Sequence, residues 1–311
     1  MCIRQPNPVP TTKAGGLGVL MLDSVHYLAV LGKIRQMERI GIERLCVFGL
    51  PPPQFVELAA DLHCQYIATA LVPMAYNPHG YSKWTLRDNR TLRSETLAAL
   101  HDRGVSISLC EGFGVKPHGD VREYAADLAI LCELEVPRIN VASSDRDVNR
   151  TFDQFAAIAE MAHAHGIETT IEIGPGPVPT LAAALAAARH VGQPYFRLLI
   201  DTMHFFRSGS GVADVAALDP DVIGYVQLCD VPLISKHASY MEEALYERLV
   251  PGTGELPLLE LLAVLPRDVV LGLEVPQRSL AEAGVGPYER VARCVEATRN
   301  LLVQAAANHR R

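Results

Sequence analysis

The feature that most constrains the fold is the alternation of short apolar segments with helical segments along most of the chain. Helical patterns occur, for example, at residues 55–62, 92–103, 121–134, 152–165 and 181–191. Between such segments lie runs rich in branched apolar residues, typical of strands buried on both faces, at residues 44–48, 66–71, 105–109, 138–142, 169–173, 196–200, 223–228 and 269–273. This alternation predicts a parallel sheet covered by helices.

Eight strand–helix repeats favour a closed (β/α)8 barrel, the TIM-barrel fold, over an open sheet. An open doubly wound sheet more often has about five or six strands and a glycine-rich first turn. Neither Gly-x-Gly-x-x-Gly nor the phosphate-binding pattern Gly-x-x-x-x-Gly-Lys occurs in the chain. Gly104, Gly166 and Gly192 follow helical segments as stop signals, and Thr151 with Gln154 predicts a capping box.

The repeat divides the chain into a barrel at residues 43–303, an N-terminal extension at 1–42 and a tail at 304–311. Within the extension, residues 24–41 have the pattern of an amphipathic helix. Such a helix could plug the N-terminal end of the barrel or pack on a partner subunit, so the pattern leaves a homodimer open.

Composition excludes several classes of protein. The net charge of the 311 residues is −7 and there is no basic stripe, which argues against a nucleic-acid partner. The seven cysteines are scattered without a Cys-x-x-Cys pair, as expected in a reducing cytoplasm. The apolar segment at 15–32 contains Asp23 and His26, so it predicts neither a membrane span nor a signal peptide.

Oxygen-bearing side chains stand at the ends of four successive predicted strands. Glu172, Asp201, Gln227 and Glu274 each come at or near the end of an apolar run. In a parallel barrel, polar residues at the carboxyl ends of strands point to the active-site face. Each of these residues alone could be a solvated loop residue, but their recurrence on four strands predicts one shared site.

A divalent cation is the simplest reason to gather these groups. Buried carboxylates are costly and repel one another, and a cation removes both costs. Three carboxylates and one amide oxygen form a hard-oxygen set that suits Mn²⁺ or Mg²⁺, with Co²⁺ and Zn²⁺ left open. Glu111, after the third predicted strand, could also enter the pocket and contact a substrate.

The same regions carry a family resemblance. The segments Ile-Glu-Ile at 171–173, Ile-Asp-Thr-Met-His-Phe-Phe-Arg-Ser-Gly at 200–209, Val-Gln-Leu-Cys-Asp at 226–230, Pro-Gly-Thr-Gly-Glu-Leu-Pro at 251–257 and Leu-Glu-Val-Pro at 273–276 resemble the xylose isomerase-like TIM-barrel superfamily. That group includes sugar-phosphate isomerases and epimerases, ketose 3-epimerases, inosose and dehydroshikimate dehydratases, and endonuclease IV. The resemblance covers residues 43 to about 303 and specifies the superfamily but no single reaction.

The resemblance also implies roles for individual residues. It implies that His204, three positions after Asp201, contacts the substrate, and that Arg248 binds a carboxylate or phosphate of the substrate. Sugar epimerases of this group usually have His where this chain has Gln227. Some dehydroshikimate dehydratases are similar to this chain in having Gln there, and this similarity favours a dehydratase.

The expected chemistry is proton abstraction next to a carbonyl group through a metal-stabilised enediolate, with Glu172 and Glu274 on opposite sides of the substrate. We therefore expect a metal-dependent isomerase or epimerase of a small polyhydroxy carbonyl compound. A lyase of the 3-dehydroshikimate dehydratase type, with His204 moving a proton, is the alternative at the same site. An endonuclease would need more His ligands and a basic face, and a binding protein without catalysis would have lost a ligand or a glutamate.

Overall fold

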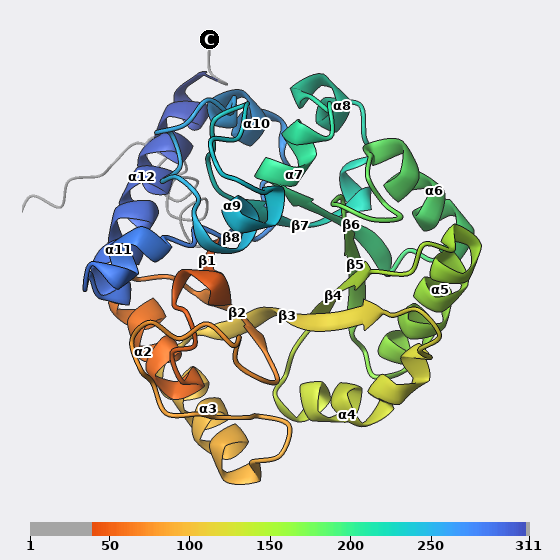
Figure 1. Ribbon diagram of the computed structural model, residues 1–311, viewed down its shortest axis with the longest axis horizontal. Coiled ribbons are helices and arrows are strands. Elements are labelled where there is room, and N and C mark those ends of the chain that lie inside the picture. Colours follow the sequence, from red (N-terminus) through yellow and green to blue (C-terminus); the bar gives the residue numbers. More distant parts are fainter. Residues whose placement is uncertain (1–38, 309–311) are drawn as a thin grey trace, which may run out of the picture.

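The computed structural model describes residues 39–308 and confirms the predicted (β/α)8 barrel (Figure 1). All neighbouring strands are parallel, each strand pairs with the next along the chain, and β8 pairs with β1 to close the sheet. The strands are β1 (Ile40–Ile42), β2 (Tyr66–Ala70), β3 (Ser106–Val115), β4 (Arg138–Ser143), β5 (Glu168–Glu172), β6 (Phe196–Asp201), β7 (Ile223–Leu228) and β8 (Leu271–Leu273).

Helices form a ring around the barrel, as Figure 1 shows. The α-helices are α2 (Pro52–Asp61), α3 (Arg90–Arg103), α4 (Ala125–Glu133), α5 (Val148–Ala164), α6 (Leu181–Val191), α7 (Thr202–Arg207), α8 (Val212–Ala216), α9 (Tyr240–Tyr246), α10 (Leu258–Val264), α11 (Arg278–Glu282) and α12 (Pro287–Asn308). Short 3-10 helices are η1 (Arg44–Cys46), η2 (Val121–Tyr124) and η3 (Pro220–Val222).

The first strand lies earlier than the sequence predicted. The apolar segment at 44–48 contains η1, and the strand is β1, directly before it. A short apolar run fits a strand and a buried helical turn equally well, so its pattern cannot choose between them. Closure of the barrel decides the matter, because Gly41 pairs with Gly272 and Ile42 with Leu273. Glu43 therefore stands at the carboxyl end of β1.

The predicted domain limits need two corrections. The boundary at residue 43 falls after β1, so the barrel begins before it, and the predicted helix at 24–41 cannot continue to its end. The rest of that helix lies outside the described residues. At the other end, α12 continues to Asn308, so residues 304–308 belong to the last helix of the barrel and not to a separate tail. A helix that packs along the barrel extends as far as its apolar face finds contacts.

Three predicted helix ends agree with the structure, and one predicted helix start is wrong. Gly104 and Gly192 cap α3 and α6 with φ angles of 64° and 65°, and Gly166 follows α5 with a φ angle of 73°, a conformation that glycine adopts without steric cost. Asp147 is the N-cap of α5, and its side chain accepts a hydrogen bond from the backbone of Arg150. Thr151 is buried inside that helix, so it does not begin a capping box. Asp147 offers the same kind of oxygen one turn earlier.

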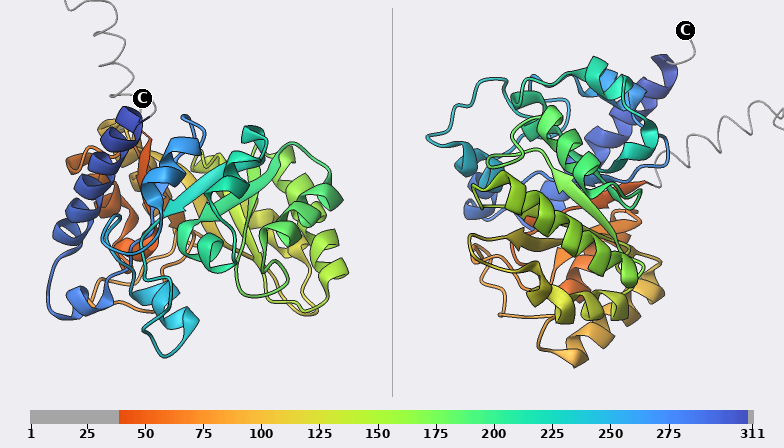
Figure 2. Two further views of the ribbon diagram at one scale, coloured as in Figure 1. Left: turned by 90° about the horizontal axis from the view of Figure 1, so that it is seen from above. Right: turned by 90° about the vertical axis from the view of Figure 1, so that its right-hand side faces the viewer.

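Side chains fill the barrel interior, and the site lies at one end of it. Ala68, Leu109, Leu199 and Tyr225 form a buried cluster from strands on different sides of the barrel. In both views of Figure 2, the segment between β7 and α9 projects from one end of the barrel, and helix α12 ends at the opposite end. None of the described helices combines the length and apolar character needed to span a bilayer.

Candidate metal centre and active site

The carboxyl ends of β5 to β8 bring the four predicted ligands to the same end of the barrel. Glu172 and Asp201 are the last residues of β5 and β6, Gln227 lies near the end of β7, and Glu274 directly follows β8. The strand register places Asp201 beside Gln227. Asp201, Gln227 and Glu274 are buried, whereas the side chain of Glu172 is 20% exposed.

Asp201 is held by a helix start and by a cation. Its Oδ1 accepts a hydrogen bond from the backbone N–H of His204 at 3.0 Å and caps α7. Its Oδ2 lies 2.5 Å from Nη1 of Arg248. Burial by itself would raise the pKa of Asp201, but Arg248 and then His204 outweigh burial and lower it. Asp201 is therefore ionised across the physiological pH range.

Arg248 is buried and all its nitrogen atoms face the protein. Nη2 lies 3.1 Å from Oε2 of Glu274, while Nε donates to the carbonyl of Ala244 at 2.9 Å. Nη1 contacts Asp201 and, at 3.3 Å, the sulfur of Cys229. In the sequence Arg248 was a candidate for binding a substrate anion, and that role stays a prediction. In the structure its guanidinium compensates two of the predicted metal ligands.

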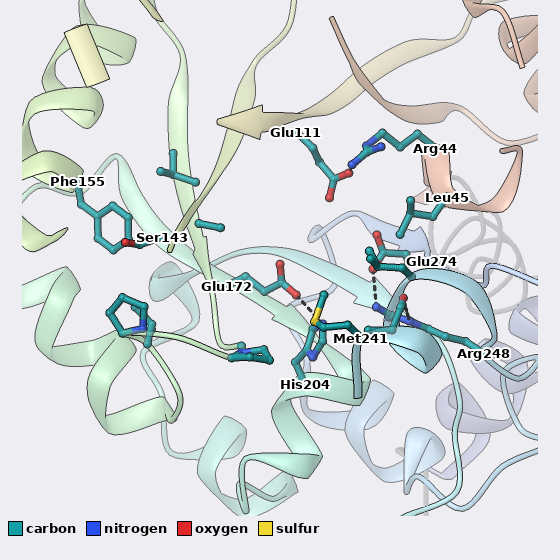
Figure 3. Close-up of a pocket in the computed structure, with 18 residues that line it drawn as sticks. Arg44, Leu45, Glu111, Ser143, Phe155, Glu172, His204, Met241, Arg248 and Glu274 are labelled. Carbon is teal, nitrogen blue, oxygen red and sulfur yellow. Dashed lines mark hydrogen bonds and ion pairs between the residues drawn. The ribbon is translucent and has the colours of Figure 1, made fainter. Parts of the chain in front are cut away.

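His204 connects Glu172 to a tyrosine. Figure 3 shows Glu172 and His204 pointing toward one another, with Nε2 of the ring 3.3 Å from Oε1 of the carboxylate. Nδ1 is hydrogen-bonded to the hydroxyl of Tyr240 in α9. Asn140 in β4 donates to the other oxygen of Glu172 at 3.3 Å. Burial lowers the pKa of His204 to about 4, so the ring is neutral near pH 7 and has one donor and one acceptor nitrogen.

Gln227 presents an unpaired oxygen inside the site. Its Nε2 lies within hydrogen-bond reach of Glu43 at 3.3 Å, Glu111 at 3.1 Å and Glu274 at 3.3 Å. Its Oε1 is buried and has no hydrogen-bond partner among residues 39–308. Buried polar atoms in proteins are nearly always paired, so an orphaned acceptor between carboxylates suits an atom that binds a cation.

Two more carboxylates, Glu43 and Glu111, lie at the mouth of the barrel, and the sequence analysis singled out only Glu111. Glu111 lines the mouth as expected, but its Oε2 pairs with Nε of Arg44 at 2.5 Å. Glu43 was missed because the predicted first strand began after it. A signal was present at Gly272 on the neighbouring strand, since a Cβ there would lie 1.8 Å from Oε1 of Glu43. Asn140 and Tyr240 were also missed, because their positions depend on packing between distant segments.

The mouth gathers more carboxyl groups than cations. Ligand atoms of Glu172, Asp201 and His204 lie within 4.8 Å of one another, and so do those of Glu43, Glu111 and Glu274. Arg44 and Arg248 are the cations in contact with them. Burial, reinforced by neighbouring carboxylates, raises the pKa values of Glu172 and Glu274 well above the usual range and that of Glu43 to about 8. A divalent cation would relieve this repulsion.

The donor chemistry therefore fits a bound metal ion. Glu172 and Asp201 lie in one close group with His204, and Glu274 lies in the other with Glu43 and Glu111. Their carboxylate oxygens and the free amide oxygen of Gln227 are donors of the hard-oxygen kind that Mn²⁺ and Mg²⁺ prefer. His204, whose ring lies beside Glu172 and Asp201, adds a nitrogen that softer metals such as Zn²⁺ accept.

A cavity of about 230 Å³ opens beside this cluster (Figure 3). Its charged wall contains Glu172, His204, Arg248 and Glu274, together with the Arg44–Glu111 pair. The apolar part of its lining is formed by Leu45, Val141, Phe155, Pro175, Pro177, Val178, Met241 and Leu245. A cavity with a few convergent polar groups in a partly apolar lining is typical of a small-molecule site.

Asp230, which also follows β7, holds the loop after α9 in place. Its Oδ2 accepts from the backbone N–H groups of Gly252 and Gly254, both at 2.9 Å, and Oδ1 accepts from Val231 and Leu256. A Cβ at residue 254 would lie 2.2 Å from Oδ1, so only glycine fits there. The Asp and the Pro-Gly-Thr-Gly segment therefore form one structural unit.

We expect Asp230→Ala to lower the free energy of unfolding by about 2–4 kcal/mol, because buried N–H groups lose their acceptor. Urea denaturation measures this change. Glu289→Ala, at a carboxylate whose side chain is 59% exposed in an i,i+4 pair, is the control and should cost no more than about 0.5 kcal/mol. Equal stability of the two variants would contradict the structural role of Asp230.

Comparisons with known proteins agree with this fold. Residues 56–298 match the family described as xylose isomerase-like TIM barrel, so the chain belongs to that family. No curated protein matches the sequence.

Solved structures with the same fold include several enzymes. The IolI protein with a bound zinc atom superposes with a TM-score of 0.70 at 14% identity, over 86% of this chain and 99% of that one. The probable 3-DHS dehydratase AsbF from Bacillus anthracis has a TM-score of 0.66 at 14% identity, over 84% and 98%. D-psicose 3-epimerase from Clostridium cellulolyticum H10, solved with D-tagatose, has a TM-score of 0.63 at 15% identity, over 85% and 99%. At these identities the likeness establishes the fold alone.

Proposed function

We propose that this protein is a divalent-metal-dependent isomerase or epimerase that acts on a small, uncharged polyhydroxy carbonyl compound. The observation that carries the proposal is the unpaired, buried Oε1 of Gln227 among the carboxylates at the barrel mouth, next to a cavity of about 230 Å³. Glu172, Asp201, Gln227 and Glu274 would hold the metal. When bound, the cation would polarise the carbonyl group and stabilise the negative charge of the enediolate.

Glu172 is the better placed of the two glutamates to take the substrate proton. Its side chain is 20% exposed and opens into the cavity, whereas that of Glu274 is 5% exposed and pairs with Arg248. His204 and Asn140 hold the two oxygens of Glu172, which orients the carboxylate. Glu274 would return a proton from the other side, and His204 would pass a proton between Glu172 and Tyr240.

The state of the cations in the cavity favours an uncharged substrate. Among the described residues, Arg44 and Arg248 are the guanidinium groups that line the cavity, and protein carboxylates already pair with both. Binding a carboxylate or phosphate group would require breaking one of these ion pairs. The alternative is a lyase of the 3-dehydroshikimate dehydratase type, which the presence of Gln227 still favours. Such a lyase would need Arg248 to leave Asp201 or Glu274 and bind the substrate carboxylate instead.

The direct test is a substrate screen with Mn²⁺ and Mg²⁺. Uncharged ketoses and inososes are compared with 3-dehydroshikimate, and products are identified by NMR in D₂O. Isomerisation of an uncharged ketose with deuterium at the carbon next to the carbonyl is the expected result. Conversion of 3-dehydroshikimate with inactivity on all ketoses would replace the proposal with the dehydratase.

Metal binding should depend on pH in a defined direction. Burial raises the pKa values of Glu172 and Glu274, so these groups hold protons to a higher pH in the metal-free protein. Because a metal binds the ionised forms, Mn²⁺ affinity should rise as the pH is raised over a range above the usual pKa of a glutamate, with release of protons. Calorimetry in buffers of different ionisation enthalpy measures this release. An affinity that is constant over that range would show that these glutamates are not ligands.

A further inference from the structure

Glu43 is a buried carboxylate that the proposed reaction does not use. It follows β1, is fully buried, and does not line the cavity. A substrate in the cavity would therefore not touch it. Its Oε1 accepts a hydrogen bond from the hydroxyl of Tyr225 at 2.8 Å, and its Oε2 faces Nε2 of Gln227 at 3.3 Å. A group with this burial and these partners can affect a substrate in the cavity only through a neighbouring residue.

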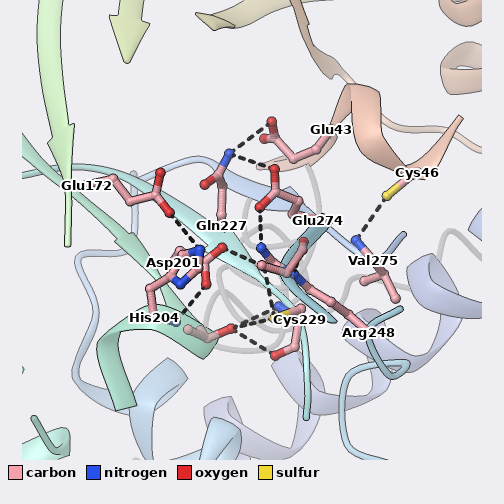
Figure 4. Close-up of polar contacts among 12 residues, drawn as sticks. Glu43, Cys46, Glu172, Asp201, His204, Gln227, Cys229, Arg248, Glu274 and Val275 are labelled. Atoms are coloured by element: carbon pink, nitrogen blue, oxygen red, sulfur yellow. Dashed lines mark hydrogen bonds and ion pairs between the residues drawn. The ribbon is translucent and has the colours of Figure 1, made fainter. Parts of the chain in front are cut away.

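The side-chain amide of Gln227 has two possible orientations, which exchange the positions of its NH₂ group and its oxygen. An amide offers hydrogen-bond donors only at its NH₂ end, and that end lies against the carboxyl oxygens. Nε2 faces Glu43, and also Glu111 at 3.1 Å and Glu274 at 3.3 Å. Turning the amide over would set its oxygen against these carboxylate oxygens. Figure 4 shows the result: the nitrogen points to Glu43 and Glu274, and the oxygen points away from them.

The barrel is shaped to keep Glu43 at this position. A Cβ at Gly272 would lie 1.8 Å from Oε1 of Glu43 and 2.7 Å from the hydroxyl of Tyr225. The hydroxyl of Tyr225 is also hydrogen-bonded to Oγ of Ser108 in β3, at 3.0 Å. Gly272, Tyr225 and Ser108 come from three different strands, so the position of the Glu43 side chain is fixed by the packing of the barrel.

We propose that Glu43 is a positioning residue that, with Tyr225, fixes the amide of Gln227 so that its oxygen faces the metal. The inference rests on the proposed metal centre and extends it to the support of one ligand. Carboxylates that orient metal ligands in this way typically contribute about 10–100-fold to metal affinity.

The test compares Mn²⁺ affinity by calorimetry in the wild type, Glu43→Gln, Gln227→Leu and the double variant. An amide at residue 43 offers both a donor and an acceptor, so residue 43 no longer favours one orientation of Gln227, while Glu111 and Glu274 still do. Glu43→Gln should therefore lower the affinity by about 10–100-fold. In the Gln227→Leu background the same substitution should change it by no more than about twofold, because the residue through which it acts is gone.

Asp127→Asn is the matched control, since Asp127 is a buried carboxylate that pairs with Arg87 and does not contact Gln227. It should leave Mn²⁺ affinity within about twofold of the wild type. If Glu43→Gln does not fold, Tyr225→Phe removes the donor to Glu43 and should lower the affinity by about 2–10-fold.

The outcomes separate this inference from the metal centre itself. Wild-type affinity in Glu43→Gln, or in Tyr225→Phe where the first variant does not fold, would overturn the positioning role alone. An equal loss in the presence and absence of Gln227 would make Glu43 a direct ligand and overturn it as well. A wild-type protein that binds no Mn²⁺ would overturn the metal centre and the inference together.

Discussion

Glu172→Gln should lower turnover by a factor on the order of 10²–10⁴, the usual contribution of a general base, in protein that still binds Mn²⁺. The amide keeps an oxygen for the metal and the approximate shape of the side chain, but it cannot accept a proton at neutral pH. Turnover of the ketose found in the screen and metal content per chain are measured on the same sample. Exchange of solvent deuterium into the substrate should fall together with turnover, because both begin with removal of the same proton.

Glu168→Gln is the matched control for this experiment. Glu168 and Glu172 are the first and last residues of β5, so the two substitutions are chemically identical and lie at opposite ends of one strand. Glu168 pairs with Arg138 and Arg197 away from the cavity, and its replacement should leave turnover close to that of the wild type. A metal-loaded Glu172→Gln protein with wild-type turnover would remove Glu172 from the reaction and make His204 the next candidate base.

Arg248→Met should destabilise the metal-free protein by about 3–5 kcal/mol, because it leaves buried carboxylates without their cation. The guanidinium pairs with Asp201 at 2.5 Å and with Glu274 at 3.1 Å, and its side chain is 2% exposed. Mn²⁺ should restore much of this loss, since a ligand at about 100 times its dissociation constant stabilises the native state by about 2.7 kcal/mol. Urea denaturation with EDTA and with Mn²⁺ measures both effects.

The comparison variant is Arg138→Met, near the opposite end of the barrel. Glu168 keeps Arg197 as a second partner there, so the loss should be about 1 kcal/mol or less and should not depend on Mn²⁺. If Arg248→Met is as stable as the wild type in EDTA, the ion pairs of Arg248 contribute nothing to folding. If Mn²⁺ stabilises neither the wild type nor Arg248→Met above its value in EDTA, the metal does not bind at Asp201 and Glu274.

The ligand positions could be predicted because they depend on local periodicity. A buried parallel strand is a continuous apolar run, so a Glu, Asp or Gln near its end marks the carboxyl edge of the sheet. This reasoning identified Glu172, Asp201, Gln227 and Glu274, which the structure places at one end of the barrel. Their role as metal ligands stays a proposal.

The partners of those residues could not be predicted, because each comes from a distant segment. Arg248 follows α9, and the sequence offered it as a contact for the substrate, yet its guanidinium lies against Asp201 and Glu274. Tyr240 reaches His204 only because α9 folds back over the mouth. Glu43 was assigned to a connection before the first strand, and the true strand was three residues long.

The sequence by itself determined the barrel, most of its strands and the oxygen atoms at its mouth, because strand and helix periods are local properties of the chain. The tertiary structure alone decided where the barrel closes, which carboxylates are paired and which polar atom is left free. Those outcomes depend on contacts across the barrel, such as Gly272 beside Glu43 and the NH₂ group of Gln227 between Glu111 and Glu274. Charge balance in a buried site is a sum over residues far apart in sequence, and only the closed barrel brings them together.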